Sequence, residues 1–251
     1  LDLGIAALVV RRGEVRFDRL DKPSTPDKFN PNHLHIKDLS LTARVFVQKT
    51  DSLAIDLRSL SFREQSGLQL QKLSFEVEAG KSNPNIRDLW IELPNTIIKS
   101  EELRAEHTHI TGSICPRDLA CFVPKLGSFG DVIDISSDVR WTTEDGRWTM
   151  DDCQWKIDNL TLSDRGGNIS LLGETTIDLK KNQTDILADI KELRTGPSLQ
   201  QFLTENLQGQ AREISPILTQ LGGTKVSGTI AYQDGDLQIE IGRAVQQECR
   251  D

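Results

Sequence analysis

One pattern of apolar and polar positions recurs along the chain. Its eight positions are, in order, an apolar residue, any residue, an apolar residue, two polar residues, Leu, any residue and an apolar residue. A period of two is typical of a β-strand with one apolar face. The extra polar residue would turn the following Leu to the wrong face of a straight strand, so we expect a β-bulge or sharp bend at the polar pair. We call this the kink pattern, and it occurs at Leu34-Ile36-Leu39-Leu41, Ile55-Leu57-Leu60-Phe62, Leu68-Leu70-Leu73-Phe75, Pro84-Ile86-Leu89-Ile91 and Trp155-Ile157-Leu160-Leu162.

The two residues before the Leu of the kink pattern are polar every time. They are Lys37-Asp38, Arg58-Ser59, Gln71-Lys72, Arg87-Asp88 and Asp158-Asn159. The copies are irregularly spaced, unlike those of a strict solenoid. The pattern therefore predicts kinked antiparallel strands that share one apolar surface.

Other segments predict the connections between these strands. Residues 1–17 predict a strand pair, with Ile5–Val10 followed by a turn at 11–13. Residues 21–33 hold three prolines without periodicity and predict a loop or crossing segment. Residues 116–123 predict a short helix that begins at Pro116 and stops at Pro124.

Three two-residue turns predict hairpin registers in the second half of the chain. Asp145-Gly146 sets Trp141 opposite Met150 and places Trp148 diagonally from Trp141. Gly166-Gly167 sets Leu162 opposite Leu171, and Asp234-Gly235 sets Tyr232 opposite Leu237 and Ile230 opposite Ile239. Residues 197–221 predict two short helices, whose apolar stripes are Leu199-Phe202-Leu203-Leu207 and Ile214-Ile217-Leu218-Leu221.

The composition favours an elongated architecture. Hydrophobic residues make up 37% of the 251 residues, which is lean for a closed globule of this size. We therefore expect a mainly β fold, namely an elongated, curled antiparallel sheet with a helix near 116–123 and a two-helix insert near 197–221. Residues 1–251 would form one segment, composed of a strand block at 1–114, a helical connection at 115–130, hairpins at 131–195, the insert at 196–222 and a hairpin at 223–242.

Charge and hydropathy argue against several classes of function. The net charge of -8 and the lack of a Lys/Arg cluster argue against nucleic-acid binding, and the charge disfavours docking on an anionic membrane. No apolar run approaches the roughly 18 residues of a membrane span. Because the sequence starts with Leu rather than Met, we expect an excised or processed segment whose targeting element lies outside it.

Candidate catalytic and metal-binding groups are few. His33/His35 and His107/His109 could ligate a metal, but exposed histidines at strand edges are expected, because no acidic residue has a matching spacing. Glu101-Glu102 and Asp151-Asp152 are adjacent pairs, and on a strand their carboxylates point to opposite faces. We therefore expect no catalytic residue, no metal, no cofactor and no enzymatic activity.

The cysteines and tryptophans leave alternatives open. Cys115 and Cys121 could pair in an oxidising compartment, although buried free thiols are the preferred interpretation. Trp141 and Trp148 could form a carbohydrate-binding platform, although a packing role is preferred.

Several stretches of the chain resemble the AsmA-like, translocation and assembly module B (TamB) family as found in Bacteroidota-type bacteria. They cover about residues 34–242 and are Leu60-Ser-Phe-Arg-Glu-Gln-Ser-Gly-Leu68, Leu73-Ser-Phe75, Leu89-Trp-Ile-Glu-Leu-Pro-Asn-Thr96, Pro116-Arg-Asp-Leu-Ala-Cys-Phe-Val-Pro124, Phe202-Leu through Gln208-Gly-Gln210, Ile217-Leu-Thr-Gln-Leu-Gly222, Gly228-Thr-Ile230 and Asp236-Leu237. Residues 242–251 depart from the continuing strand that such proteins would show.

The resemblance implies a function in the Gram-negative cell envelope. Such proteins are anchored in the inner membrane and extend through the periplasm as a β-taco, an open apolar groove. They are implicated in phospholipid transport toward the outer membrane and in outer-membrane protein assembly. The present chain would be a periplasmic segment, anchored by a helix outside it.

The kink pattern by itself also suits a groove for phospholipid acyl chains, which needs apolar surface and no catalytic residue. The expected lipid-groove residues are Leu34, Ile36, Leu39, Leu41, Ile55, Leu57, Leu60, Phe62, Leu68, Leu70, Leu73, Phe75, Ile86, Leu89, Ile91, Trp155, Ile157, Leu160 and Leu162. One alternative is a scaffold that binds an outer-membrane assembly protein by strand addition. A carbohydrate-binding β domain is a weaker alternative, and packing of the same leucines on one another is a structural alternative.

Overall fold

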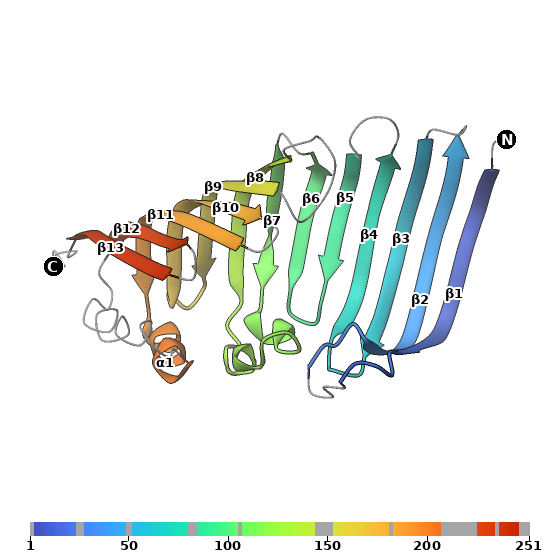
Figure 1. Ribbon diagram of the computed structural model, residues 1–251, viewed down its shortest axis with the longest axis horizontal. Coiled ribbons are helices and arrows are strands. Elements are labelled where there is room, and N and C mark those ends of the chain that lie inside the picture. The colour runs from blue at the N-terminus through green and yellow to red at the C-terminus, as the bar shows by residue number, and fades with distance from the viewer. Residues whose placement is uncertain are drawn as a thin grey trace. The chain divides into compact units, whose positions relative to one another are not determined.

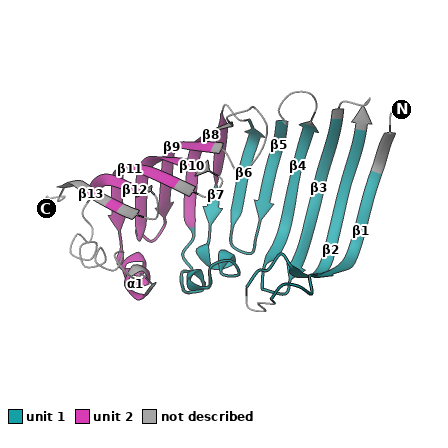
Figure 2. Ribbon diagram, viewed as in Figure 1, with its two compact units in different colours: residues 1–104, 112–132 teal, residues 105–111, 133–251 magenta. Residues whose placement is uncertain are grey.

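The fold is mainly β, with an antiparallel sheet that is not closed and one short helix. The computed structural model describes residues 3–23, 28–48, 52–79, 85–104, 107–143, 153–180, 183–206, 225–233 and 236–245 (Figure 1). They belong to two compact units (Figure 2): unit 1 holds residues 1–104 and 112–132, and unit 2 holds residues 105–111 and 133–251. The expected mainly β, antiparallel class is confirmed.

In unit 1 each strand pairs with the next along the chain, in antiparallel orientation from β1 to β6. The strands are β1 (Leu3–Asp18), β2 (His33–Gln48), β3 (Ser52–Glu64), β4 (Gln69–Ala79), β5 (Asn85–Glu92) and β6 (Ile97–Leu103). The next strand, β7 (Thr108–Ile114), is divided between the units and is followed in unit 1 by two 3-10 turns, η1 (Pro116–Leu119) and η2 (Pro124–Ser128).

Unit 2 repeats the same meander. Antiparallel pairing links its strands in chain order from β8 to β13. The elements are β8 (Ile133–Thr143), β9 (Cys153–Asp164), β10 (Ile169–Lys180), β11 (Gln183–Thr195), α1 (Pro197–Asn206), β12 (Lys225–Gln233) and β13 (Asp236–Val245).

The strands are bulged at the polar pairs, as the kink pattern predicts. Asp38, Asp88 and Asn159 have φ values of 54°, 52° and 51°, the left-handed conformation that Asn and Asp tolerate better than other non-glycine residues. The Arg58-Ser59 and Gln71-Lys72 pairs carry register shifts without a positive φ. Local sequence therefore placed all five irregularities, although they differ in backbone conformation.

Bulges on neighbouring strands compensate one another. In the pairing of β3 with β4, Leu60 stands opposite Leu73. Between this pair and the pair Leu57–Phe75, β3 has one residue more than β4. Between Leu60–Leu73 and the pair Phe62–Leu70, β4 has one residue more than β3. The two irregularities cancel, so the apolar residues of both strands stay on one face along their length.

The prediction of a strand pair at residues 1–17 is wrong. Residues 3–18 form the single strand β1, and Arg12, with a φ of 53°, lies in a bulge rather than in a turn. Val10, Gly13 and Val15 stand at the spacing of the kink pattern with Gly in place of Leu, which is the signal that distinguishes this bulge from a hairpin.

The helical predictions are confirmed in part. Residues 116–119 form a helical turn, but Pro124 begins the second turn, η2, instead of ending the segment, since proline suits the first position of a helix. The first helix of the predicted insert is α1, which starts at Pro197. The second predicted helix lies outside the described residues.

Two of the three predicted hairpin registers are confirmed. Leu162 pairs with Leu171, and Tyr232 pairs with Leu237. The register predicted from Asp145-Gly146 is wrong, because Trp141 pairs with Trp155 and not with Met150. Residues 144–152, including Trp148, lie outside the described residues.

Candidate functional site

Cross-strand rows of aliphatic side chains form the main candidate site in unit 1. A row consists of apolar-face residues on successive strands, each of which is paired with the next across the sheet. Two rows are Val10–Leu41–Leu60–Leu73–Ile91–Ile98 and Val45–Ile55–Val77–Ile86–Leu103. Because cross-strand neighbours lie about 5 Å apart, each row is a continuous apolar stripe.

Unit 2 carries similar rows, one of which includes Thr175 and another two tryptophans. They are Ile135–Leu162–Leu171–Leu193–Val226, Val139–Ile157–Thr175–Ala188–Ile230 and Trp141–Trp155–Ile177–Ile186. The third row begins with the two indole rings in contact, their centroids 5.3 Å apart. Trp141 is 8% exposed, so it packs against Trp155 within the apolar face.

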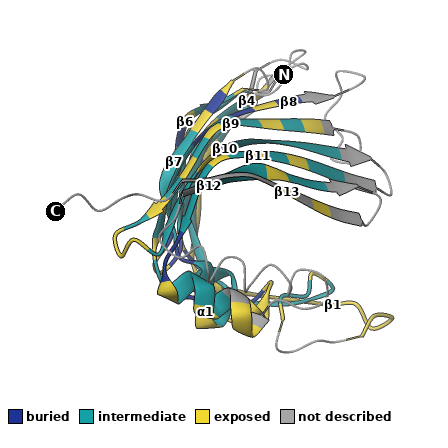
Figure 3. Ribbon diagram, turned by 90° about the vertical axis from the view of Figure 1, so that its left-hand side faces the viewer, coloured by how far each residue is buried: buried dark blue, intermediate teal, exposed yellow. Residues whose placement is uncertain are grey.

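The apolar rows are half-buried rather than enclosed. Among the residues predicted for the lipid groove, Leu57 and Leu70 are buried, at 8% and 9% exposure, and all the others fall in the intermediate class. Figure 3 shows the same class along most of the described strands. The described strands all belong to the meanders, so no second sheet layer in this part of the chain covers the rows.

The opposite face of unit 1 is polar and ion-paired. His33 contacts Asp18 at 3.2 Å, His35 contacts Glu14 at 2.6 Å, and Arg87 contacts Glu78 at 2.7 Å. Farther along this face the ammonium groups of Lys99 and Lys72 lie 4.1 and 5.1 Å from the centre of the Trp90 ring. The two faces therefore differ sharply in chemistry, as alternation with bulges requires.

Some irregular strands were missed from the sequence. Besides β1, strand β11 carries register shifts on both sides around Lys191 and Glu192, and β13 carries one at Gly242. The signal was present in β11, because Ala188, Ile190 and Leu193 stand at the spacing of the kink pattern around its polar pair.

A capping segment closes one end of unit 1. The backbone N–H of Cys115 donates to Thr96 Oγ1 at 2.9 Å, and Phe29 N–H donates to the Cys121 carbonyl at 2.9 Å. The Phe29 and Phe122 rings lie 5.1 Å apart. Contacts between segments remote in sequence therefore hold η1 and η2 in place.

Both cysteines of this cap are free thiols, which agrees with the preferred interpretation of the sequence. Cys115 and Cys121 are 2% and 6% exposed, and desolvation by burial raises the pKa of the Cys121 thiol. Thiols buried in this way are unreactive, so neither residue is placed for covalent chemistry.

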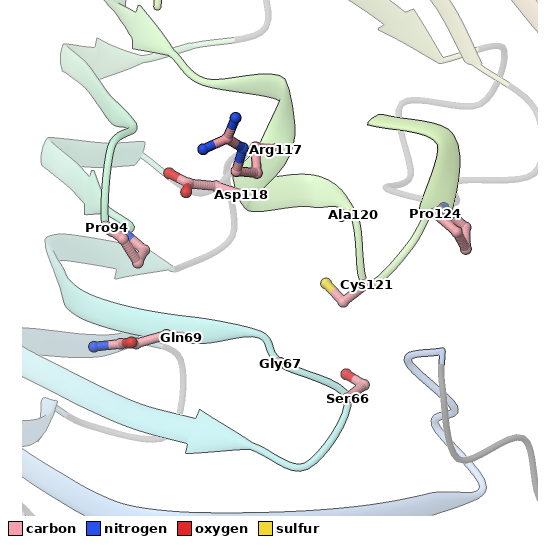
Figure 4. Close-up of a pocket in the computed structure, with 9 residues that line it drawn as sticks. All are labelled: Ser66, Gly67, Gln69, Pro94, Arg117, Asp118, Ala120, Cys121 and Pro124. Atoms are coloured by element: carbon pink, nitrogen blue, oxygen red, sulfur yellow. The ribbon is translucent and has the colours of Figure 1, made fainter. Parts of the chain in front are cut away.

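A cavity of about 350 Å³ lies between this cap and two hairpin turns (Figure 4). Its walls come from the β3–β4 turn, the β5–β6 turn and both 3-10 turns. The lining residues are Ser66, Gly67, Gln69, Pro94, Arg117, Asp118, Ala120, Cys121 and Pro124. Polar groups line much of it, in contrast to the apolar rows.

The histidine pairs differ from the expectation of exposed residues without acidic partners. His33 and His35 are half-buried and bonded to carboxylates of β1, whereas His107 and His109 are exposed, with His109 Nδ1 2.9 Å from Asp138 Oδ1. Neighbouring strands supply the acidic partners, which local spacing cannot reveal.

No cluster of metal-ligating side chains occurs among the residues that the structure describes, and none of the described helices is long and apolar enough to cross a membrane.

Comparison with protein-family models, with curated proteins and with solved structures finds no match to this chain.

Proposed function

We propose that the apolar rows bind phospholipid acyl chains and that the chain is a periplasmic segment of an inner-membrane-anchored, AsmA/TamB-like protein. In this proposal the groove carries phospholipids between the inner and outer membranes during outer-membrane biogenesis. The observation that carries the proposal is the half-exposure of continuous apolar rows on a face that no second sheet layer covers among the described residues. The resemblance noted in the sequence supplies the cellular setting.

The physical chemistry of the rows fits an acyl chain better than a specific ligand. Burial of each methylene gains about 0.8 kcal/mol, and aliphatic side chains provide no directional contact that would select one tail. A surface of this kind accepts many chains and lets them move along it. The polar opposite face would remain in water.

Site-specific photocrosslinking tests this proposal. A photoreactive phenylalanine derivative replaces Leu60, which lies in a row, or its neighbour Ser61, which points to the opposite face. The cross-link to phospholipid is expected at position 60 and absent at position 61. Equal labelling at both positions, or none at either together with no lipid in native mass spectra, would contradict the proposal.

Strand addition remains a second candidate function, in which the chain is a scaffold for outer-membrane protein assembly. Strand β1 pairs with β2 along one edge, and exposed apolar side chains follow it, including Val9 at 50% and Phe17 at 49% exposure. Exposed edges of this kind can accept a partner strand. Crosslinking from Val9 to an added protein strand, with no effect of changes in the apolar rows, would favour this function.

A further inference from the structure

The cavity beneath the cap of unit 1 is lined by one positive and one negative side chain that form no ion pair with each other. Arg117 and Asp118 are adjacent in η1 and both line the cavity (Figure 4). Neither forms an ion pair with any residue that the structure describes. The cavity wall therefore includes two side chains of opposite charge that have no ion-pair partner among the described residues.

The Asp118 carboxylate is held in position by Asn95, and the Arg117 guanidinium lies against the backbone of Gly130. Asp118 Oδ2 accepts from the Asn95 backbone N–H at 2.7 Å, and Asp118 Oδ1 accepts from the Asn95 side-chain amide at 3.0 Å. The Arg117 guanidinium lies directly over Gly130, where a Cβ would come within 2.7 Å of its central carbon. Glycine at position 130 is thus what leaves room for this arginine.

A ligand that carries both charges fits this wall best. A simple phosphate would be attracted to Arg117 but repelled by Asp118, and a simple amine would meet the reverse. Arginine binds phosphate oxygens through its planar set of N–H donors, while a carboxylate with free lone pairs accepts from an ammonium group. The complementary chemistry is a phosphodiester joined to an ammonium group.

The position of the cavity links it to the apolar rows. Ser66 and Gly67 belong to the turn between β3 and β4, and the first apolar pair beyond this turn is Phe62 opposite Leu70. The cavity therefore adjoins the turn beside this pair, at the end of two strands that carry the rows. A volume of about 350 Å³ lies at the lower end of the range for small-ligand sites, roughly 300–1,000 Å³, and suits a head group rather than a whole lipid.

We infer that this cavity is a head-group site for a zwitterionic phosphodiester of the phosphoethanolamine type, with the phosphate at Arg117 and the ammonium at Asp118. The inference rests on the proposed function for the assignment of a lipid source. The same head-group chemistry also occurs in soluble glycerophosphodiesters, so the two sources are tested separately.

The first experiment uses soluble compounds that have no acyl chain. Glycerophosphoethanolamine, glycerol 3-phosphate and ethanolamine are titrated into the protein while the backbone amide signals of Gly67 and Ala120 are followed by NMR. We expect saturable shifts with glycerophosphoethanolamine only. Binding should weaken by about tenfold or more in Arg117→Gln and in Gly130→Ala, which keeps the arginine but displaces it. Arg63→Gln, at an exposed arginine of β3, is the matched control and should bind as the original protein does.

The second experiment separates the lipid source from the soluble one. Lysophosphatidylethanolamine and lysophosphatidylglycerol are compared in binding to the original protein and to Arg117→Gln, with native mass spectrometry as the readout. A preference for the ethanolamine lipid that disappears in the variant supports the inference. Absence of saturable shifts with glycerophosphoethanolamine, or an unchanged lipid preference in Arg117→Gln, would overturn it while leaving lipid binding by the rows intact. Binding of the soluble compound without any lipid would instead support the cavity and contradict the proposed function.

Discussion

Asn159 donates a hydrogen bond from its side-chain amide to Asp138 Oδ2 at 2.9 Å, although Asn159 itself lies in the bulge of β9 with a φ of 51°. The residue that bends the strand therefore also fastens it to β8. Asp138 accepts a second bond from His109 of β7 through its other oxygen, so one carboxylate joins three strands of unit 2. A polar residue of the kink pattern thus links neighbouring strands by a hydrogen bond, in addition to lying outside the apolar face.

The left-handed residues provide a direct test of the bulges. Asp38→Gly and Asp88→Gly should leave stability nearly unchanged, because glycine adopts a positive φ without steric cost. Asp38→Val and Asp88→Val should each lower the free energy of unfolding by about 1–2 kcal/mol, the cost of a Cβ in this conformation. Urea denaturation followed by tryptophan fluorescence gives the comparison, and equal stability of the glycine and valine variants would show that the bulges do not have this conformation.

The depth of two neighbouring leucines predicts different consequences of truncation. Leu57→Ala should destabilise the protein by about 2–5 kcal/mol, because Leu57 is buried and its removal leaves a cavity. Leu60→Ala should cost about 1 kcal/mol, because Leu60 is only half-buried. Lipid content in native mass spectra should fall in Leu60→Gln while the fold, followed by circular dichroism, remains. If Leu60→Ala proved as costly as Leu57→Ala, the rows would be a closed core instead of a binding surface.

A close backbone contact fixes the identity of Gly112. A Cβ at this position would overlap the Ile97 carbonyl oxygen and lie 2.9 Å from Ile98 Cα, and backbone atoms cannot turn aside as a side chain can. Gly112→Ala should therefore cost about 1–3 kcal/mol in the free energy of unfolding. Gly127→Ala is the control, since its Cβ would make an ordinary 3.6 Å contact with Ala120, and a change within about 0.5 kcal/mol is expected. A neutral Gly112→Ala would mean that β6 and β7 lie farther apart.

Acid should weaken the contacts between strands on the polar face. The pKa of Glu14 is lowered mainly by its hydrogen bond with His35, that of Asp18 by Arg16 and then His33, and that of Asp138 by Asn159 and then His109. A carboxyl group whose pKa is lower in the folded than in the unfolded state stabilises the fold above its ordinary pKa of about 4. This stabilisation is lost as the pH falls through the lowered folded value.

Chemical denaturation between pH 7 and pH 2 measures this effect. Stability should decline below about pH 4, and the decline should be shallower in Glu14→Gln and Asp138→Asn than in the original protein. Asp21→Asn, at an exposed carboxylate whose bond to Arg19 joins no two strands, serves as the control and should decline in stability as the original protein does. Identical slopes in all four proteins would contradict a role for these bonds.

The sequence alone determined the β class, the residues of the apolar face and the positions of the predicted bulges. These features are local: a period of two sets the face, and one additional polar residue forces an irregularity wherever the phase must be restored. The registers at Gly166-Gly167 and Asp234-Gly235 were equally local, since a two-residue turn fixes the pairing of its strands.

Only the tertiary structure decided features that depend on segments remote from one another. The contacts of Asp118 with Asn95 and of Phe29 with Cys121 build the cap and its cavity, and no spacing in the sequence specifies them. The pairing of Trp141 with Trp155 departs from the register that Asp145-Gly146 predicts, so the local turn signal did not decide it. Finally, the apolar rows could equally have been a core. Their half-exposure depends on whether another layer covers them, and this is a property of the assembled chain rather than of any one strand.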